Sequence, residues 1–355
     1  MKRLLIPALL FLAACGAPKS ASLDVGGAKL RVTGPYAHEN LAVYLIHSDA
    51  RDDRDYVTLD EALKSRQVEV TEKAQEQVNE LTLENKGDRP VFVQEGDRVI
   101  GGKQDRIIGL SFVVPPKSGK MPVPSFCVES GRWAGAQMFF SAGVTNAFAS
   151  KEVREAAKFG KNQGEVWEQV ARAKGEATRA LQTPNTNSSL NETLESEKAR
   201  KLCEAYAAAF AGLLPKHPDA VGAAIVLNGR IEEVNVYPGH PLLAKVFPRL
   251  VQSYALAAIA KKEGPAAPAA GDVARFMQEG QVRNRRSEKV AGGNDLDVMD
   301  CDKQLRCETR YGGQVVHAQW MNRGEASAPR GDERRNRGQN EQPQQQQEQQ
   351  PPKRD

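Results

Sequence analysis

The sequence is poor in the residues on which most catalytic and metal-binding sites depend. Its 355 residues include five histidines and five cysteines, and aromatic residues make up only 6% of the chain. No two of the histidines stand at the spacing of metal ligands: His38, His47, His217, His240 and His317. The sequence therefore predicts no metal site and no cofactor. No catalytic triad follows from the order of its residues, which argues against an enzyme without deciding the question.

An excess of charge of one sign is also missing. The chain has 49 Lys and Arg against 45 Asp and Glu, a formal net charge of only +4. The basic residues are scattered among acidic ones, and few aromatic side chains are available to stack on bases. The composition therefore argues against a nucleic-acid partner.

The N-terminus carries an apolar run that is too short to span a membrane. Met1-Lys2-Arg3 precedes the run from Leu4 to Leu12, which is well below the roughly 20 residues of a spanning helix. This is the layout of an export signal that is removed. Leu12-Ala13-Ala14-Cys15 then resembles the lipobox of bacterial lipoproteins, in which the cysteine is lipidated.

This resemblance implies a division of the N-terminal segment and a location for the protein. Residues 1–14 would be the signal peptide, Cys15 would carry a palmitate-containing lipid anchor, and residues 15–27 would form a tether. Gly16 after the cysteine implies the outer rather than the inner membrane of the cell envelope. The alternative is an ordinary secretory signal with an incidental cysteine.

The other cysteines are Cys127, Cys203, Cys301 and Cys307. The last two flank the turn of an expected hairpin, and a turn centred on Lys303-Gln304-Leu305 would make them face each other. They could then form a disulfide in an oxidising compartment. Two thiols remain an equal alternative.

The pattern of apolar residues predicts an α+β fold. Residues 28–148 read mostly as strands, in an antiparallel sheet or a sandwich, with one short helix after the capping box Thr58 to Glu61. Residues 149–322 read as helices and hairpins, including a hairpin at Asn228-Gly229 and a long helix from Pro241 to Lys262. Residues 323–355 are rich in Gln, Arg and Pro, which predicts a disordered tail.

One stretch of the strand-rich half, EGDRVIGGKQDRIIG from Glu95 to Gly109, invites comparison with a phosphate-binding loop. That motif needs Gly-Lys followed by Ser or Thr and then a helix, because the hydroxyl holds magnesium and the helix directs its amides at the phosphates. Here Gln104 replaces the hydroxyl and the following residues favour a strand. The stretch therefore predicts the turn of a hairpin.

The same stretch belongs to a longer series of motifs that resembles a known family. The resemblance is to the ARG and rhodanese-phosphatase superfamily associated protein domain, and it covers most of the chain between residues 28 and 321. This family is uncharacterised and implies no activity or catalytic residues. The motifs are Glu95-Gly96, Gly101-Gly102-Lys103-Gln104-x-Arg106, Pro115-Pro116, Pro124-x-x-Cys127-Val128-Glu129-x-Gly131-Arg132-Trp133, Val221-Gly222, Asn228-Gly229, Phe247-Pro248 and Gln314-Val315-Val316-His317-Ala318.

Polar residues in these motifs form the candidate site. If their strands are neighbours, they meet at the ends of a sheet, where they form either a ligand site or a structural set of ion pairs. We expect a lipid-anchored binding or scaffolding module with an envelope protein or the cell wall as partner. The alternative is an envelope enzyme that uses these residues on an anionic substrate, with Cys127 as a nucleophile or a buried apolar residue. The candidate residues are Glu95, Lys103, Gln104, Arg106, Cys127, Glu129 and Arg132.

Overall fold

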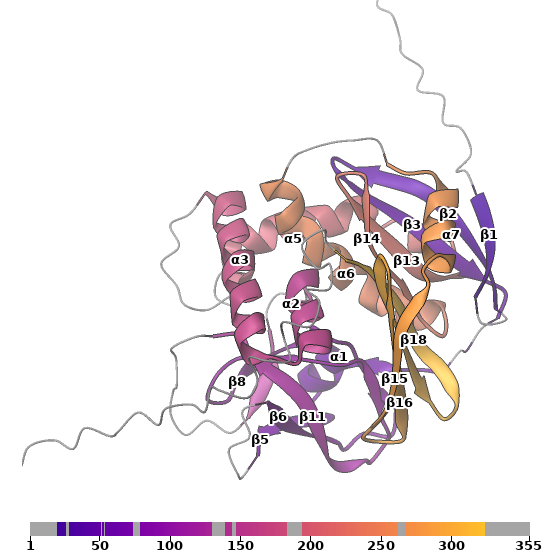
Figure 1. Cartoon of the computed structure of the whole chain (residues 1–355). Helices are drawn as coiled ribbons and strands as arrows, with labels where there is room; N and C mark the ends of the chain where they lie inside the picture. Colours follow the sequence, from indigo (N-terminus) through magenta and orange to yellow (C-terminus); the bar gives the residue numbers. More distant parts are fainter. Residues whose placement is uncertain are drawn as a thin grey trace, which may run out of the picture. The chain divides into compact units, whose positions relative to one another are not determined.

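The computed structural model describes residues 20–25, 28–50, 52, 54–73, 79–129, 139–143, 147–182, 194–261 and 267–323 (Figure 1). The signal peptide, Cys15 and the predicted tail at 323–355, apart from its first residue, therefore lie outside the described residues. So does Arg132. The described elements form an α+β fold, as the sequence predicted.

The largest sheet has nine strands in the order β1-β2-β3-β13-β14-β18-β17-β16-β15, and each strand is antiparallel to its neighbours. Its strands come from residues 20–48 and 220–322. The sheet therefore combines strands from both parts of the predicted division into residues 28–148 and 149–322. Its strands are β1 Ser20–Val25, β2 Ala28–His38, β3 Leu41–Ser48, β13 Ala220–Leu227, β14 Arg230–Val236, β15 Val282–Val290, β16 Asn294–Cys301, β17 Gln304–Tyr311 and β18 Gln314–Asn322.

Both faces of this sheet are covered by helices, which explains why every residue of β3 is buried. Leu41, Val43 and Leu45 pack against α5 (Glu197–Phe210) and α6 (His240–Ala260). The alternate residues of β3 face the other way and pack with α7 (Ala270–Gln278). Figure 1 shows α7 lying against β1 and β2, away from α5.

Two smaller sheets are formed by the strands between residues 57 and 142, which follow β3 in the sequence. One has six strands in the order β12-β8-β9-β11-β6-β5, and the other three in the order β10-β7-β4. Their apolar core also includes Leu296, Val298 and Cys307 from β16 and β17. The β16–β17 hairpin therefore packs on the two smaller sheets. The strands are β4 Val57–Thr58, β5 Val68–Glu72, β6 Glu80–Asn85, β7 Val91–Val93, β8 Arg98–Gly101, β9 Arg106–Ile108, β10 Phe112–Val114, β11 Gly119–Cys127 and β12 Phe140–Ala142.

The remaining helices follow the predicted order closely. The capping box is confirmed at the start of α1 (Leu59–Lys64), where Thr58 and Glu61 bond each other's backbone amides. The part of the chain predicted as helices and hairpins begins with α2 (Lys151–Glu155), which is continued by a π-helical segment, η1 (Ala156–Gly160). Helix α3 then spans Gln163–Leu181. A 3-10 turn, η2, spans Leu214–Lys216. Helix α6 is long and apolar enough to cross a membrane, yet it packs in the core as predicted.

Two segments form strands that the sequence analysis did not assign. Residues 20–25, assigned to the tether, form β1 and pair with β2 from Ser20↔Thr33 to Val25↔Ala28. The tether assignment was wrong for these residues because Ala21 and Leu23 alternate with polar side chains, which is enough for a strand at a sheet edge. Residues 282–290 form β15, whose side chains are mostly exposed.

The expected disulfide between Cys301 and Cys307 is not formed, because the hairpin has a different register. Asp300 pairs with Leu305, and Cys307 lies opposite Val298. The turn is thus a tight one at Asp302-Lys303 rather than a turn centred on Gln304. Both cysteines are buried, and neither is joined to the other.

Candidate functional site

The stretch that resembled a phosphate-binding loop is the turn of a hairpin. Strands β8 and β9 pair antiparallel, with Arg98 opposite Ile107 and Val99 opposite Arg106. Gly101 and Gly102 have φ values of 123° and 57°, which disfavour other residues. A Cβ at Gly102 would lie 2.2 Å from Cζ of Phe140. The glycine pair therefore serves a close backbone approach within the fold.

The polar residues around this turn bind one another. Lys103 and Arg106 both approach Glu72: the Lys103 amide donates to Oε1 at 3.1 Å, and Nη2 of Arg106 lies 3.5 Å from the same oxygen. Arg106 also donates to the Gln104 carbonyl at 3.1 Å, and the Asp105 amide donates to Glu129 Oε2 at 3.2 Å. Among them, Gln104, Arg106 and Glu129 are buried, with at most 6% of each exposed.

Glu95, which the sequence analysis grouped with them, contacts a different set of residues. Its Oε1 lies 3.7 Å from Arg154 Nη1, and its Oε2 lies 3.5 Å from Lys158 Nζ. Arg154 binds Glu233 through two parallel hydrogen bonds, at 2.7 and 2.9 Å. Two carboxylates therefore face two cations, and all four side chains are buried. The predicted cluster is thus divided into a hairpin group and a central network.

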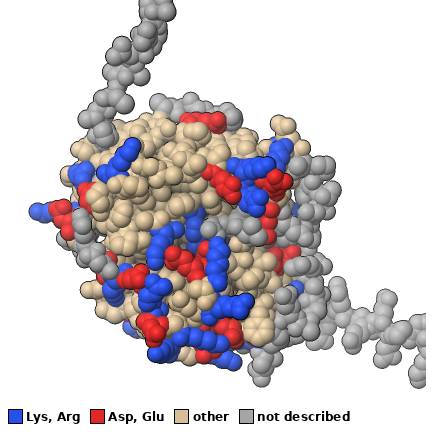
Figure 2. Space-filling model, turned by 180° about the vertical axis from the view of Figure 1, so that it is seen from behind, with Lys and Arg blue, Asp and Glu red and all other residues tan. Residues whose placement is uncertain are grey.

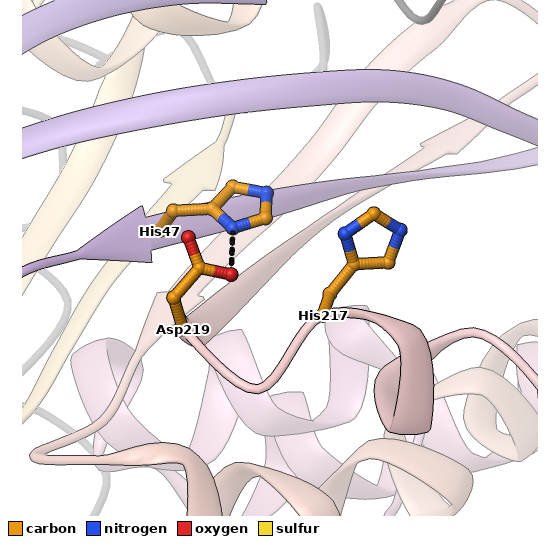
Figure 3. A group of neighbouring side chains, drawn as sticks. All are labelled: His47, His217 and Asp219. Atoms are coloured by element: carbon orange, nitrogen blue, oxygen red, sulfur yellow. Dashed lines mark ion pairs between the residues drawn. The ribbon is translucent and has the colours of Figure 1, made fainter.

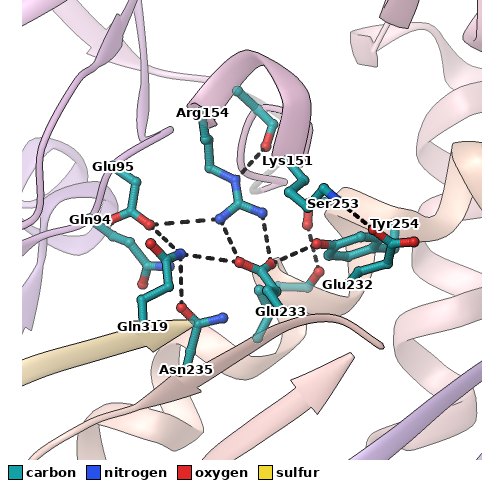
Figure 4. Close-up of polar contacts among 12 residues, drawn as sticks. Gln94, Glu95, Lys151, Arg154, Glu232, Glu233, Asn235, Ser253, Tyr254 and Gln319 are labelled. Carbon is teal, nitrogen blue, oxygen red and sulfur yellow. Dashed lines mark hydrogen bonds and ion pairs between the residues drawn. The ribbon is translucent and has the colours of Figure 1, made fainter. Parts of the chain in front are cut away.

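Neutral side chains complete the central network (Figure 4). Nε2 of Gln319 donates to Glu95 at 2.6 Å and to Glu233 at 3.1 Å, and its Oε1 accepts from Lys158 at 2.8 Å. The Tyr254 hydroxyl donates to Glu233 at 2.9 Å. The network joins the loop before β8 to α2, η1, β14, α6 and β18. Moving one of these elements away would leave a buried charge unpaired, which is costly. The network therefore fixes the relative positions of these elements.

The protonation states agree with this arrangement. Burial favours the protonated form of Glu233, but the Arg154 guanidinium and the hydrogen bonds outweigh it and lower the pKa to about 2. Burial lowers the pKa of His317, which stacks on Tyr237 at 5.0 Å, to about 4. At neutral pH the network therefore holds ionised carboxylates beside a neutral imidazole.

The motifs that build both groups are those of one protein family. A family model described as the ARG and Rhodanese-Phosphatase-superfamily-associated Protein domain matches residues 29–321. The chain belongs to this family. The match begins at the second residue of β2 and ends in β18, so it includes every element that contributes to the network. No curated protein and no solved structure matches the chain.

Within this ARG and rhodanese-phosphatase associated domain, Cys127 has the surroundings of a structural residue. It lies opposite Arg106 at the β9–β11 pairing, and its backbone exchanges two hydrogen bonds with the Gln163 side chain, at 3.0 and 2.9 Å. Burial raises the pKa of the thiol, and Arg106 offsets this only in part. A protonated, buried thiol is a poor nucleophile.

A second polar group lies at the ends of β2, β3 and the η2–β13 connection (Figure 3). His47, His217 and Asp219 each offer a ligand atom within 4.8 Å of the others, so they are able to hold a metal ion. His47 Nδ1 is 2.9 Å from Asp219 Oδ1, and His47 Nε2 is 2.7 Å from Thr33 Oγ1. The order hydroxyl, imidazole, carboxylate is that of a hydrolase triad, but Thr33 is buried, which argues against its hydroxyl as a nucleophile.

Several of these residues could not be found from the sequence. Glu72, Arg154 and Glu233 come from separate elements and carry no local motif. For the second group, the only local signal is the His217-Pro218-Asp219 spacing, while His47 is 170 positions away from His217 in the printed numbering. The fold brings them together through the β3–β13 pairing, in which Ala220 lies opposite His47.

Proposed function

We propose that the chain is a lipid-anchored protein of the bacterial cell envelope whose folded domain is a binding or scaffolding module. The binding or scaffolding role rests on one observation: the polar residues of the family motifs bind other residues of the fold. Glu95, Arg106 and Glu129 are buried against partners from the same chain. Such pairing supports the interpretation of these residues as a structural set of ion pairs and hydrogen bonds rather than a ligand site.

The lipobox supports the first part of the proposal, and the position of β1 sharpens it. The ladder begins at Ser20, and an extended chain from position 15 to position 20 reaches at most about 18 Å. A lipid on Cys15 would therefore hold β1 close to the membrane surface. By resemblance to lipoproteins of Gram-negative bacteria, Gly16 favours the outer membrane.

The charge distribution supports a partner that is not strongly charged. Figure 2 shows, on the face opposite to that of Figure 1, Lys and Arg side chains interspersed with Asp and Glu. Such a surface has no extended region of one sign on this face to attract a polyanion. A protein or an uncharged part of the cell wall is the partner that this face fits best.

Metabolic labelling tests the anchor. Cells of a Gram-negative host that express the full chain or its Cys15→Ala variant are fed an alkyne analogue of palmitate and then fractionated. We expect label and membrane association for the natural sequence and neither for the variant. An unlabelled natural chain, or equal label in both, would refute the anchor.

In-cell crosslinking tests the binding role. A photoreactive residue replaces Trp167, whose side chain is large, apolar and 40% exposed, and a matched control replaces Glu168, which is also exposed. A binding module at the envelope predicts a discrete adduct from position 167 that disappears when Cys15→Ala is added. If position 167 gives no adduct, or the same adducts as position 168 in both backgrounds, this surface does not serve a partner.

A further inference from the structure

The group of His47, His217 and Asp219 lies beside an open groove. The groove has a volume of about 580 Å³ and is lined by residues of β1, β2 and β3, with Arg31, His47 and Asp219 in its wall. His47 is almost completely buried, whereas His217 and Asp219 are partly exposed. A small solute can therefore reach Asp219 from the groove, next to the His47 ring.

The Nε2 atom of each imidazole is within hydrogen-bond distance of a hydroxyl group. Nε2 of His47 lies 2.7 Å from Thr33 Oγ1, and Nε2 of His217 lies 3.0 Å from the Tyr36 hydroxyl. When a hydroxyl accepts a proton from Nε2, the other ring nitrogen, Nδ1, presents a lone pair. Metal-binding histidines are commonly fixed in this way by a polar partner on the nitrogen that does not bind the metal.

The other ring nitrogen of each histidine, Nδ1, lies on the side of the Asp219 carboxylate (Figure 3). Figure 3 shows the second nitrogen of the His217 ring turned toward His47 and Asp219. Nδ1 of His47 lies 2.9 Å from Asp219 Oδ1, so the imidazole and the carboxylate already meet as a close polar pair. A metal ion that displaces the proton between these two groups would gain a nitrogen and an oxygen ligand at once, because histidine binds metals in its neutral form through a free ring nitrogen.

We propose that His47, His217 and Asp219 bind one divalent transition-metal ion, with Zn²⁺ as the best match to two imidazoles and one carboxylate. Three protein ligands leave a fourth position for water or a solute from the groove, as in sites that are not purely structural. Tetrahedral Zn²⁺ brings its ligand atoms to about 3.4 Å from one another. The ligand atoms lie within 4.8 Å of one another, and His47 Nδ1 and Asp219 Oδ1 are 2.9 Å apart. Side-chain shifts of about 1 Å are therefore needed to reach the tetrahedral spacing.

Neighbouring charges act on the bound ion in both directions. Arg31 donates to Asp219 Oδ2 at 2.8 Å, which orients the carboxylate but opposes a cation. Asp24 and Asp49 also line the groove and offset the positive charges of Arg31 and of Lys29, which lines it too. The site goes beyond the proposed envelope role and does not depend on it, since its ligands lie in the folded domain.

A cobalt and zinc titration tests the site. The full chain is purified in detergent without a polyhistidine tag, stripped of metal, and titrated with Co²⁺ followed by competing Zn²⁺. We expect one Co²⁺ per chain, with visible d–d bands and no thiolate charge-transfer band. His217→Gln and Asp219→Asn should each weaken Zn²⁺ binding at least about 100-fold, and Tyr36→Phe about 10-fold.

The matched control is His38→Gln, which removes a histidine that packs on Tyr206 and Phe210 outside the group. It should bind Zn²⁺ like the natural sequence. Thermal melting without metal establishes that each variant is folded, and either His217→Gln or Asp219→Asn suffices if the other does not fold. Absence of binding, a thiolate band, or an affinity unchanged in the ligand variants would overturn the proposal.

Discussion

Replacing His317 with glutamine should flatten the pH dependence of the protein's stability between pH 4 and 6.5. The ring is 2% exposed, and Nε2 lies 3.0 Å from Asn235 Oδ1, so the side chain is enclosed by the network. Burial lowers its pKa from 6.5 to about 4, and the negative charge of Glu95 offsets this only in part. Glutamine can keep the hydrogen bond to Asn235 but does not titrate.

The sign of the effect follows from where protons bind. Between pH 6.5 and 4 the unfolded chain binds a proton at His317 and the folded chain does not. Stability from the neutral imidazole is therefore complete above pH 6.5 and is lost as the pH falls to 4. The full window corresponds to about 3 kcal/mol, and the part between pH 7 and 4.5 to about 2 kcal/mol.

The assay is urea unfolding of the natural sequence and of His317→Gln at pH 7.0, 6.0, 5.0 and 4.5. The series ends at pH 4.5 because the contribution of Glu233, whose pKa is lowered to about 2, begins to be lost below it. The natural sequence should lose about 2 kcal/mol more than the variant. Tyr237→Phe is the control, since it removes a hydrogen bond to Gln94 but should leave the slope unchanged. Parallel profiles for His317→Gln and the natural sequence would refute the reasoning.

Three further predictions concern the network, the hairpin and the thiols. Arg154→Met should cost about 3–5 kcal/mol in urea unfolding, because it leaves two buried carboxylates short of a cation; a cost below 1 kcal/mol would contradict the network. Gly102→Ala should lower the melting temperature more than Gly119→Ala, because both have positive φ but only Gly102 lacks space for a Cβ; equal losses would disprove the contact. Cys301 and Cys307 should both react with a thiol reagent in denaturant without reductant, whereas a gain in titratable thiols on reduction would reveal a disulfide.

Local sequence signals predicted the parts of the fold that local contacts determine. The hairpin at Asn228-Gly229 and the capping box at Thr58 were both recognised, because the residues that specify each of them are close in sequence. The strand-rich early half and the helices after Ser150 followed from the period of apolar residues.

The order of strands could not be predicted in the same way. Strand β3 pairs with β13, so Leu41 lies opposite Leu227, and nothing near either residue identifies the other. The same limit applies to the site: Glu95 was singled out, but its pairing with Arg154 and Lys158 depends on how the layers meet. Segment 282–290 was missed because an exposed edge strand needs no apolar alternation.

One edge of the nine-stranded sheet, strand β15, affects how two copies of the protein can associate. Strand β15 presents Arg283, Arg285 and Lys289 to solvent, paired with acidic residues of the same ribbon. Charged edge strands resist pairing with another chain. Lipid-anchored copies would collide in one plane and in a common orientation, where an unprotected edge could join sheet to sheet into fibres. The charged ribbon would let such a protein crowd on a membrane without polymerising.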